Sequence, residues 1–305
     1  MSLKAEIHDL GYKRYEGTRN PASRRWRVIM RYQLAFAWQT WWRYKLALAL
    51  TVIATFVFGV LIYVLRSKTI TEFDKAGVTV RFVDLMVFTA IGVLVKFAFI
   101  VTMTMTAMTI ANDERTGALT FYFVRSTRPI DYVLGRFAGL FLLNGVILIV
   151  APLLLVLMRV GLADTGEDPV TNALMIPKII LLGTLSTAAF SSVPLAFSAM
   201  SKNQWTGFAM WAGWYIMGGQ IMALLGMMVA GSFGAVDLAV ATSQGALKLL
   251  DIAIVIPGQK SGGDVAVSFV PLAASLISLA VQAAAGLAVA TFKLQRAQRG
   301  LAVGQ

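Results

Sequence analysis

Long apolar stretches separated by short polar segments dominate the pattern of this chain. Six of the stretches reach about 20 residues or more, the length that a helix needs to cross a hydrocarbon core about 30 Å thick. The pattern therefore predicts an all-α, polytopic membrane protein with six transmembrane helices. The predicted spans are residues 46–65, 85–110, 133–158, 174–199, 207–230 and 265–292.

These spans divide the chain into a basic N-terminal part, 1–45, a single six-helix transmembrane domain, 46–292, and a C-terminal tail, 293–305. They leave no room for a soluble domain of ordinary size, about 100–150 residues. Residues 1–27 are polar and basic, so we expect no cleavable signal peptide. Residues 28–45 mix Trp and Tyr with Arg and Lys, a composition that predicts a helix lying along the membrane interface.

Composition agrees with a membrane protein. Hydrophobic residues make up 58% of the 305 residues and charged residues only 14%, and the mean hydropathy is +0.72. The chain has no cysteine and one histidine, His8, in the N-terminal part. This excludes disulfides, thiolate chemistry, a histidine relay and a histidine-based zinc site. We therefore predict neither a metal site nor catalytic residues in this chain, and no nucleic-acid partner.

The distribution of Lys and Arg sets the expected orientation, because cytoplasmic loops carry an excess of both. Residues 1–45 hold ten of the 27, segment 111–136 adds four, and the C-terminal tail adds three. The connection 159–173 has one arginine against three acids, while 66–84 is an exception with four cations against three acids. The balance predicts six spans with both termini in the cytoplasm.

The acidic residues bear on what drives such a protein. Carriers driven by protons or sodium normally use carboxylates inside the membrane, and none of the 15 acids lies in the interior of a predicted span. The chain also lacks nucleotide-binding machinery. Its closest approach to a phosphate-binding loop, residues 257–263, does not have the Gly-x-x-x-x-Gly-Lys spacing. If the protein is a pump, a separate subunit must supply the energy.

The polar segment between the second and third spans, residues 112–136, is longer than a hairpin requires. It opens with charged residues and continues as a mostly apolar helical stretch, Ala118–Val124. The helix breaks before Pro129, and the chain re-enters the membrane at Tyr132. We interpret this segment as a small folded element on the membrane face that receives a cytoplasmic partner.

Segment 112–136 resembles the coupling region of ABC-2-type permeases, the membrane subunits of a class of ATP-binding-cassette exporters. The matching motifs are Glu114-Arg115, Gly117-Ala118-Leu119, Ser126-Thr127-Arg128-Pro129-Ile130 and Leu134-Gly135-Arg136. Asp131 departs from the family pattern, which usually has a basic or polar residue there. Phe121-Tyr122 stands where an acidic-apolar pair is common. Both departures affect which ATPase is recognised. The motif covers about 25 residues, while the six-span layout agrees over most of the chain.

The resemblance implies a permease that forms the substrate pathway as a dimer, with a second copy or a homologue, in a bacterial or archaeal plasma membrane. Cytoplasmic ATPase subunits would bind the ATP and magnesium, so the chain itself would be no enzyme and would hold no cofactor. The residues implied in ATPase coupling are Asp113, Glu114, Arg115, Gly117, Leu119 and Pro129. We expect residues 112–124 to form a helix in a groove of the ATPase, with Leu119 packing inside. An ion-coupled secondary transporter and a non-transport membrane scaffold are the alternatives.

Lys96 is the one charge near the middle of a predicted span, where a lysine costs roughly 2.5–3.5 kcal/mol. We expect it to face the dimer cavity or another protein-lined polar pocket, and structural polar packing is the alternative to a pathway role. The threonines that follow it can instead bond to carbonyls of their own helix. The pathway candidates are Lys96, Thr102, Thr106, Asn144 and Gln220.

Two further expectations concern assembly and the outer face. The second and fifth spans should form the central dimer interface, where Gly213, Gly218 and Gly219 allow close helix approach. In the connection 231–264, the apolar run 246–256 covers only about 16 Å as a helix and cannot cross the bilayer. We expect this run to form a re-entrant or surface helix that roofs the pathway, and membrane lipids to surround the whole bundle.

Overall fold

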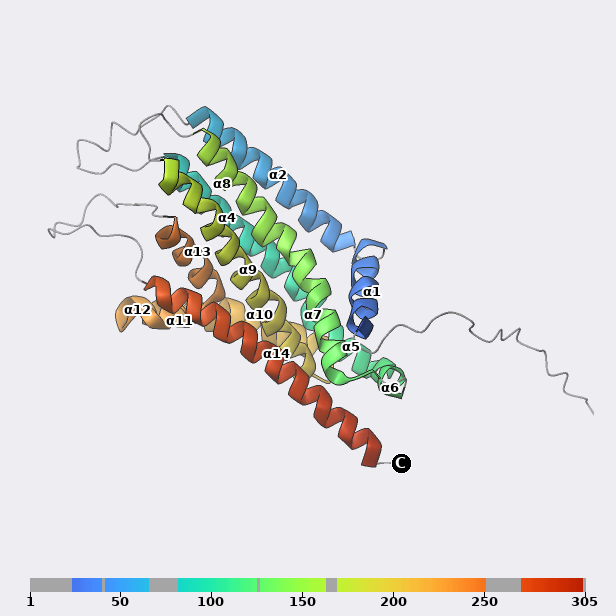
Figure 1. The fold of residues 1–305 in the computed structure, drawn as a ribbon. Coiled ribbons are helices and arrows are strands. Elements are labelled where there is room, and N and C mark those ends of the chain that lie inside the picture. The colour runs from blue at the N-terminus through green and yellow to red at the C-terminus, as the bar shows by residue number, and fades with distance from the viewer. Residues whose placement is uncertain are drawn as a thin grey trace, which may run out of the picture.

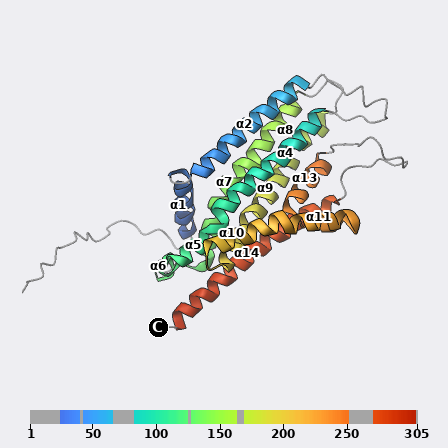
Figure 2. The same cartoon turned by 180° about the vertical axis from the view of Figure 1, so that it is seen from behind.

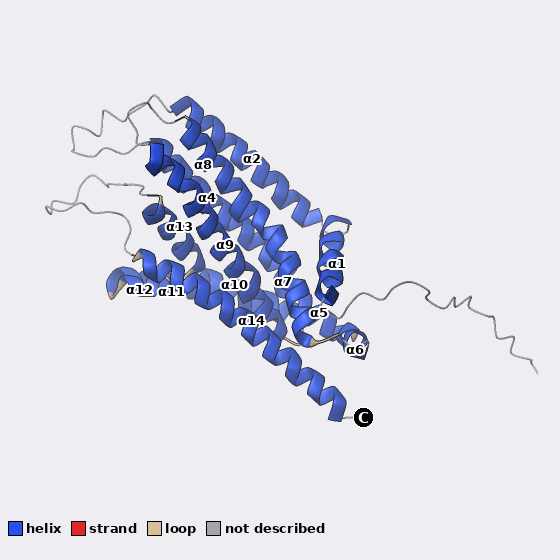
Figure 3. Cartoon of the chain, in the orientation of Figure 1, coloured by secondary structure: helices blue, strands red, loops and turns tan. Residues whose placement is uncertain are grey.

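The structure is a computed structural model, and it describes most of the chain. The described residues are 24–39, 42–65, 82–124, 127–162, 169–250 and 270–303. The regular elements in these ranges are all helices, and none is a strand (Figure 3). The prediction of an all-α chain is confirmed for this part of the sequence.

Six helices of the described part are long and apolar enough to cross a membrane, as the hydropathy pattern predicts. They cover Trp42–Leu65, Val83–Arg115, Pro129–Gly161, Asn172–Met200, Gln204–Met228 and Leu272–Arg299. The second, third and fifth each contain a five-residue π-helical turn. The architecture fits a multi-pass membrane protein.

The spans consist of successive helices. They are α2 (Trp42–Leu65); α4 (Phe82–Val101), η2 (Thr102–Thr106) and α5 (Ala107–Arg115); α7 (Pro129–Gly145), η3 (Val146–Val150) and α8 (Ala151–Gly161); α9 (Pro169–Met200); α10 (Gln204–Gly213), η4 (Trp214–Gly218) and α11 (Gly219–Met228); and α14 (Leu272–Val303). The shorter helices are α1 (Arg25–Gln39), α6 (Ala118–Val124), α12 (Gly231–Gly234) and α13 (Leu238–Leu249). Figures 1 and 2 show α1 and α6 near one end of the bundle, here called the α6 end, and α13 near the other, the α13 end.

The helix predicted over residues 28–45 is divided in the structure. α1 ends at Gln39, and Trp42–Lys45 already belong to α2, which runs at a clear angle to α1 (Figure 1). α1 packs on α7, where two glycines leave room for it. A Cβ on Gly135 or Gly139 would come within 2.8 Å of atoms of α1. The Leu-Gly-Arg step of the sequence therefore also serves the packing of α1.

α9 is the central helix of the bundle. Its most apolar 18-residue window is 67% buried, compared with 17% for α2 and for the fifth span. α14 runs along α9 (Figures 1 and 2) and approaches it closely, because a Cβ on Gly286 would stand 2.7 Å from the backbone carbonyl of Ser192. α2, the fifth span and much of α14 form the outer surface of the chain.

The connection after the fifth span differs from the prediction in where its helix begins. A helix was expected over 246–256, whereas α13 covers Leu238–Leu249 and residues 251–269 lie outside the described part. The physical reason is an N-cap: the carboxylate of Asp237 accepts a hydrogen bond from the N–H of Ala239 at 2.8 Å. α13 packs against α4, α9 and α14, so this helix contributes to the interior of the bundle.

The substitution Gly286→Ala tests the close approach of α14 to α9. The added methyl group must displace the backbone at Ser192, and overpacking of this kind costs about 1–3 kcal/mol. We expect a lower melting temperature in detergent. Gly92→Ala is the matched control, because no atom lies within 4 Å of the added Cβ there, and it should leave the melting temperature unchanged or slightly higher. Equal melting temperatures for the two variants would contradict the packing.

Candidate functional site

The segment between the second and third spans folds as two helices joined by a tight turn. α5 ends at Arg115, and Gly117 follows with φ of 72°, in the left-handed region that glycine adopts without strain. The N–H of Gly117 donates to the carbonyl of Glu114 at 3.1 Å, and α6 begins at Ala118. The glycine of the Gly-Ala-Leu step thus allows the chain to change direction between α5 and α6. The expectation of one helix over residues 112–124 is therefore wrong, because the left-handed backbone at Gly117 ends one helix before the next begins.

α6 is anchored by one face and exposes the other. Leu119 is only 5% exposed and packs in the core of the chain, and the ring of Tyr122 lies 5.3 Å from that of Tyr132. Burial is the largest cause that raises the pKa of Tyr122 above its ordinary value. Phe121, by contrast, is 73% exposed. The expectation for Leu119 is corrected accordingly: Leu119 holds α6 to the bundle, and Phe121 is the apolar side chain that α6 presents.

The other residues predicted for coupling surround α6. Glu114 and Arg115 are exposed in the last turn of α5. Pro129 is the first residue of α7, where its fixed φ and missing N–H suit a helix start. Asp131 lies in the first turn of α7 and complements the positive end of the helix dipole. Asp113 differs from these residues because it belongs to a buried polar cluster.

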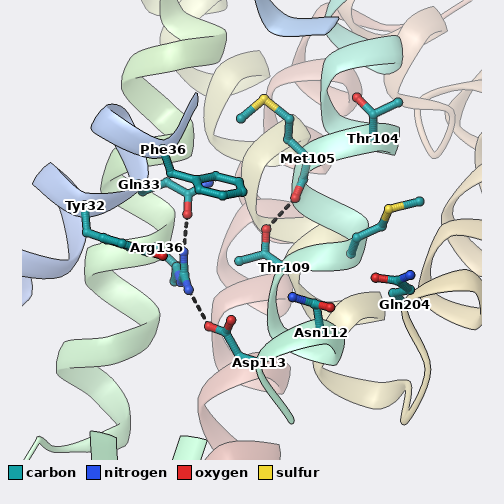
Figure 4. A pocket seen from close by; sticks show the side chains of 11 residues that line it. Tyr32, Gln33, Phe36, Thr104, Met105, Thr109, Asn112, Asp113, Arg136 and Gln204 are labelled. Carbon is teal, nitrogen blue, oxygen red and sulfur yellow. Dashed lines mark hydrogen bonds and ion pairs between the residues drawn. The ribbon is translucent and has the colours of Figure 1, made fainter. Parts of the chain in front are cut away.

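Arg136 of α7 is the centre of that cluster, which joins three helices (Figure 4). Its guanidinium donates to the carboxylate of Asp113 on α5 and to the side-chain oxygen of Gln33 on α1, and its side chain is only 5% exposed. The hydroxyl of Tyr132 donates to the same carboxylate oxygen at 2.5 Å. The ring of Tyr32 lies 5.7 Å from the guanidinium carbon. The cluster therefore fixes the last turn of α5, from which α6 follows, to both α1 and α7.

The sequence pattern contained a signal for part of this cluster. Arg136 lies seven residues after Pro129, about 10 Å into the third span, where an unpaired charge is costly. That depth requires a nearby carboxylate, and Asp113 lies close to the end of the second span. The partners Gln33 and Tyr132 were missed, because the face that α1 turns toward α7 depends on helix packing that no local pattern encodes.

A second buried ion pair lies at the α13 end of the same span. Arg159 of α8 donates from Nε to the carboxylate of Asp84 on α4 at 2.5 Å and from a terminal nitrogen to Asn172 on α9 at 3.0 Å. Arg136 and Arg159 are 23 residues apart, about 35 Å along the helix and close to the thickness of a bilayer core. The two ion pairs thus lie near opposite ends of the bundle.

A partly enclosed cavity of about 160 Å³ lies beside the Arg136–Asp113 pair (Figure 4). α1, η2, α5, α7 and α10 line it. The polar lining includes the side chains of Asp113, Arg136, Asn112 and Gln204, and the apolar lining includes Phe36, Met105 and Met108. This space is far larger than one water molecule needs, and it offers both charged and amide partners.

The threonines of the second span mainly satisfy their own helix. Thr102 donates to the carbonyl of Phe99 and Thr104 to that of Ile100, at 3.0 and 2.9 Å. The indole N–H of Trp211 donates to Thr102 at 3.2 Å, which links the second and fifth spans. Thr106 is also fully buried. Thr102 and Thr104 thus bond to carbonyls of their own helix, whereas the Thr106 hydroxyl has no hydrogen-bond partner among the described residues. A pathway role for Thr102 and Thr106 stays a prediction.

The remaining pathway candidates lie in different environments and are not brought together. Asn144 is fully buried and donates to Ser191 of α9 at 3.2 Å. Lys96 on α4 and Gln220 on α11 are exposed on the outside of the single chain. Asn144 therefore belongs to the interior packing, while Lys96 and Gln220 are available to whatever surrounds the protein in the membrane.

Asp237 is a buried carboxylate that the sequence pattern placed in an external connection. It is only 3% exposed, one oxygen caps α13, and the other has no hydrogen-bond partner among the described residues. Burial raises its pKa, and the backbone hydrogen bonds from Ala239 and Val240 oppose that shift. Gly219 packs against it, since a Cβ there would lie 2.9 Å from the carboxylate. The expectation that Gly219 lies at a dimer interface is corrected, because this glycine is buried within its own chain.

Comparison with known proteins does not identify a family for this chain. No protein-family model matches the sequence, and no curated protein is significantly similar to it. Within the described ranges, no group of three or more His, Asp or Glu side chains is placed to hold a metal ion. The functional argument rests on the folded segment between the second and third spans and on the cluster beneath it.

Breaking the Arg136–Asp113 pair should release α1 from the bundle. Removing one partner of a buried pair costs about 3–5 kcal/mol, because the other charge is left without compensation. In Arg136→Gln, we expect the amides of residues 25–39 to exchange hydrogen at least about tenfold faster, since 1.4 kcal/mol corresponds to a factor of ten.

The matched control is Arg159→Gln, which breaks the pair at the α13 end. It should speed exchange at the start of α4 and leave α1 protected. If both variants changed α1 equally, or if neither changed it, the cluster around Arg136 would not be what holds α1 in place.

Proposed function

We propose that this chain is the permease subunit of an ABC-2-type exporter. It forms the substrate pathway as a dimer, with a second copy or a homologue, and couples to separate cytoplasmic ATPase subunits that bind ATP and magnesium. The α6 end then faces the cytoplasm together with both termini, as the distribution of Lys and Arg favours. α1, which carries Trp, Tyr and Arg side chains, lies along the cytoplasmic interface of a bacterial or archaeal plasma membrane.

The exposed face of α6 is the observation that carries this proposal. Protein interfaces draw their affinity from large apolar side chains at the centre and their partner choice from surrounding charges. Phe121 is such an apolar side chain, and Glu114 and Arg115 are exposed in the adjoining turn. The Phe121 ring is exposed at the end of the bundle in the single chain. A groove in an ATPase subunit would remove this ring from water, which explains why an apolar side chain stands there.

The cluster beneath α6 supports a coupling function. Asp113 lies near the end of the second span, Arg136 lies seven residues into the third, and Gln33 belongs to α1. A force on α6 therefore acts on two spans and on α1 as one unit, because the buried ion pair resists separation. When the ATPase moves α6, the Arg136–Asp113 pair passes that movement to the second and third spans, which line the pathway in this proposal.

A second permease copy accounts for the position of Lys96. This residue is exposed on α4, 13 residues and about 20 Å from the start of the span at Val83. A lysine facing lipid chains at that depth costs roughly 2.5–3.5 kcal/mol, and a protein-lined polar cavity removes much of this cost. The fifth span, which carries Gln220, is also largely exposed and can complete such a cavity.

An ion-coupled carrier is the second candidate, and Asp237 is the observation that favours it. A buried carboxylate with one oxygen free of hydrogen bonds can take up a proton or a cation during transport. The cap on α13 already gives Asp237 a structural function. Co-purification of an ATPase, with hydrolysis that responds to substrate, separates the exporter both from this carrier and from a scaffold that only recruits a partner.

Reversing the charges beside α6 tests the docking site. The double variant Glu114→Arg, Arg115→Glu should abolish association with the ATPase, because each introduced charge faces a like charge of the partner. Phe121→Ala should weaken association by about 2 kcal/mol, the effect of losing an apolar anchor. Co-purification from the native membrane and the melting temperature of the permease are the measurements.

The control reverses two exposed charges near the end of α14, Lys293→Glu and Arg296→Glu, and should leave the ATPase bound. Unaltered co-purification and transport in the Glu114 and Arg115 double variant would rule out α6 as the docking element.

Replacing Lys96 tests the pathway. In Lys96→Leu, ATPase subunits should remain bound, because the residue lies far from α6, while stimulation of ATP hydrolysis by substrate should fall at least about tenfold. Thr89→Leu, at another exposed position of α4, is the matched control and should retain stimulation. Full stimulation in Lys96→Leu would remove this residue from the pathway and leave the permease proposal standing.

A further inference from the structure

The cavity beside the Arg136–Asp113 pair changes from polar to apolar along the membrane normal. Asp113 lies two residues before the end of the second span, and Gln204 is the first residue of the fifth, so both belong to the headgroup level. Met105 and Thr104 line the same cavity eight and nine residues before Asp113, about 12 Å deeper along the helix, and the Thr104 hydroxyl donates to the carbonyl of Ile100 in its own helix. The cavity therefore runs from headgroups toward hydrocarbon, which is the direction of a lipid molecule.

Hydrogen-bond donors gather at the polar end of the cavity. Arg136 lines the cavity while only 4% exposed, and its two terminal nitrogens, which carry two N–H groups each, make one hydrogen bond apiece to Gln33 and Asp113. Asn112 of α5 and Gln204 of α10 add side-chain amides from two other helices (Figure 4). Donors of this kind suit an acceptor with several oxygens, and phosphate is the common example in membranes.

The charge of the cavity narrows the choice of ligand. Asp113 neutralises Arg136, so the polar end has both signs of charge and a net charge of zero. The Asp113 side chain is 15% exposed and also lines the cavity, which leaves it available to a cation. The ring of Tyr32 borders the same space and can face an ammonium group. A ligand with one negative and one positive group matches this arrangement better than an anion does.

We propose that this cavity binds the headgroup of a zwitterionic phospholipid such as phosphatidylethanolamine. The phosphate accepts hydrogen bonds from Arg136, Asn112 and Gln204, the ammonium group faces Asp113, and an acyl chain follows Met105 toward the hydrocarbon. The bound lipid fills the space between α1 and α5 and so stabilises α1 against the bundle. This site does not depend on the exporter assignment.

The test is native mass spectrometry of the purified full chain, in detergent, during stepwise addition of dioleoyl phosphatidylethanolamine. Dioleoyl phosphatidylglycerol and dioleoylglycerol are the comparison lipids, and glycerophosphoethanolamine and inorganic phosphate are soluble competitors. The variants are Asn112→Leu and Gln204→Leu, which come from different helices, so one remains informative if the other fails to fold. Thr55→Val is the control, because Thr55 lines an apolar cavity of about 380 Å³ between α2 and α8.

We expect one phosphatidylethanolamine to bind more tightly than the rest, and each variant to weaken it about tenfold, as loss of a hydrogen bond to a charged group does. Thr55→Val should bind it as the unaltered chain does. Equal retention of phosphatidylglycerol or of dioleoylglycerol, or unchanged binding in both variants, would overturn the proposal. Displacement by millimolar glycerophosphoethanolamine or inorganic phosphate would show that the site takes a soluble phosphate, and would equally overturn the lipid assignment.

Discussion

A guanidinium buried between helices keeps its charge, so it is costly to bury unless a carboxylate lies beside it, and this constraint organises the α6 end of the protein. Arg136 forms an ion pair with Asp113 of α5, and it donates a second hydrogen bond to Gln33 of α1. Three segments that are far apart in sequence are thereby fixed to one another. The short helix α6 stands on this base, held by Leu119 and by the contact of Tyr122 with Tyr132.

The same constraint recurs at the α13 end, where Arg159 and Asp84 form the second buried pair. Both pairs join the second span to the third, one near each end, so these two helices resist sliding past each other. Relative motion of this unit must then occur at its borders with other spans. The largely exposed fifth span is one such border, and the aromatic rings of Phe99, Trp211 and Tyr215 pack along it. Transport by rigid units that rock against each other is consistent with this division.

Much of the architecture could be predicted from sequence because the membrane imposes a simple length rule. Twenty apolar residues mark a span whatever their neighbours are, and the helix start at Pro129 follows from the backbone preferences of proline. The turn at Gly117 was missed, because a single helix was expected over residues 112–124. Features that depend on contacts between distant helices could not be predicted in this way. The inward face of Leu119, the burial of Gly219 and the partnership of Gln33 with Arg136 are of this kind.

The start of α13 shows how a single polar residue can override an apolar run. The hydrophobic stretch 246–256 suggests a helix of its own, yet Asp237 accepts hydrogen bonds from two backbone N–H groups and the helix begins eight residues earlier, at Leu238. Capping also bears on the choice between the two functions. Protonation of Asp237 would weaken the hydrogen bonds that begin α13, so a proton-driven cycle would loosen this helix at every turnover. An exporter driven by ATP needs no such change. If the protein is an exporter, Asp237 keeps its charge throughout the cycle and serves only as the N-cap of α13.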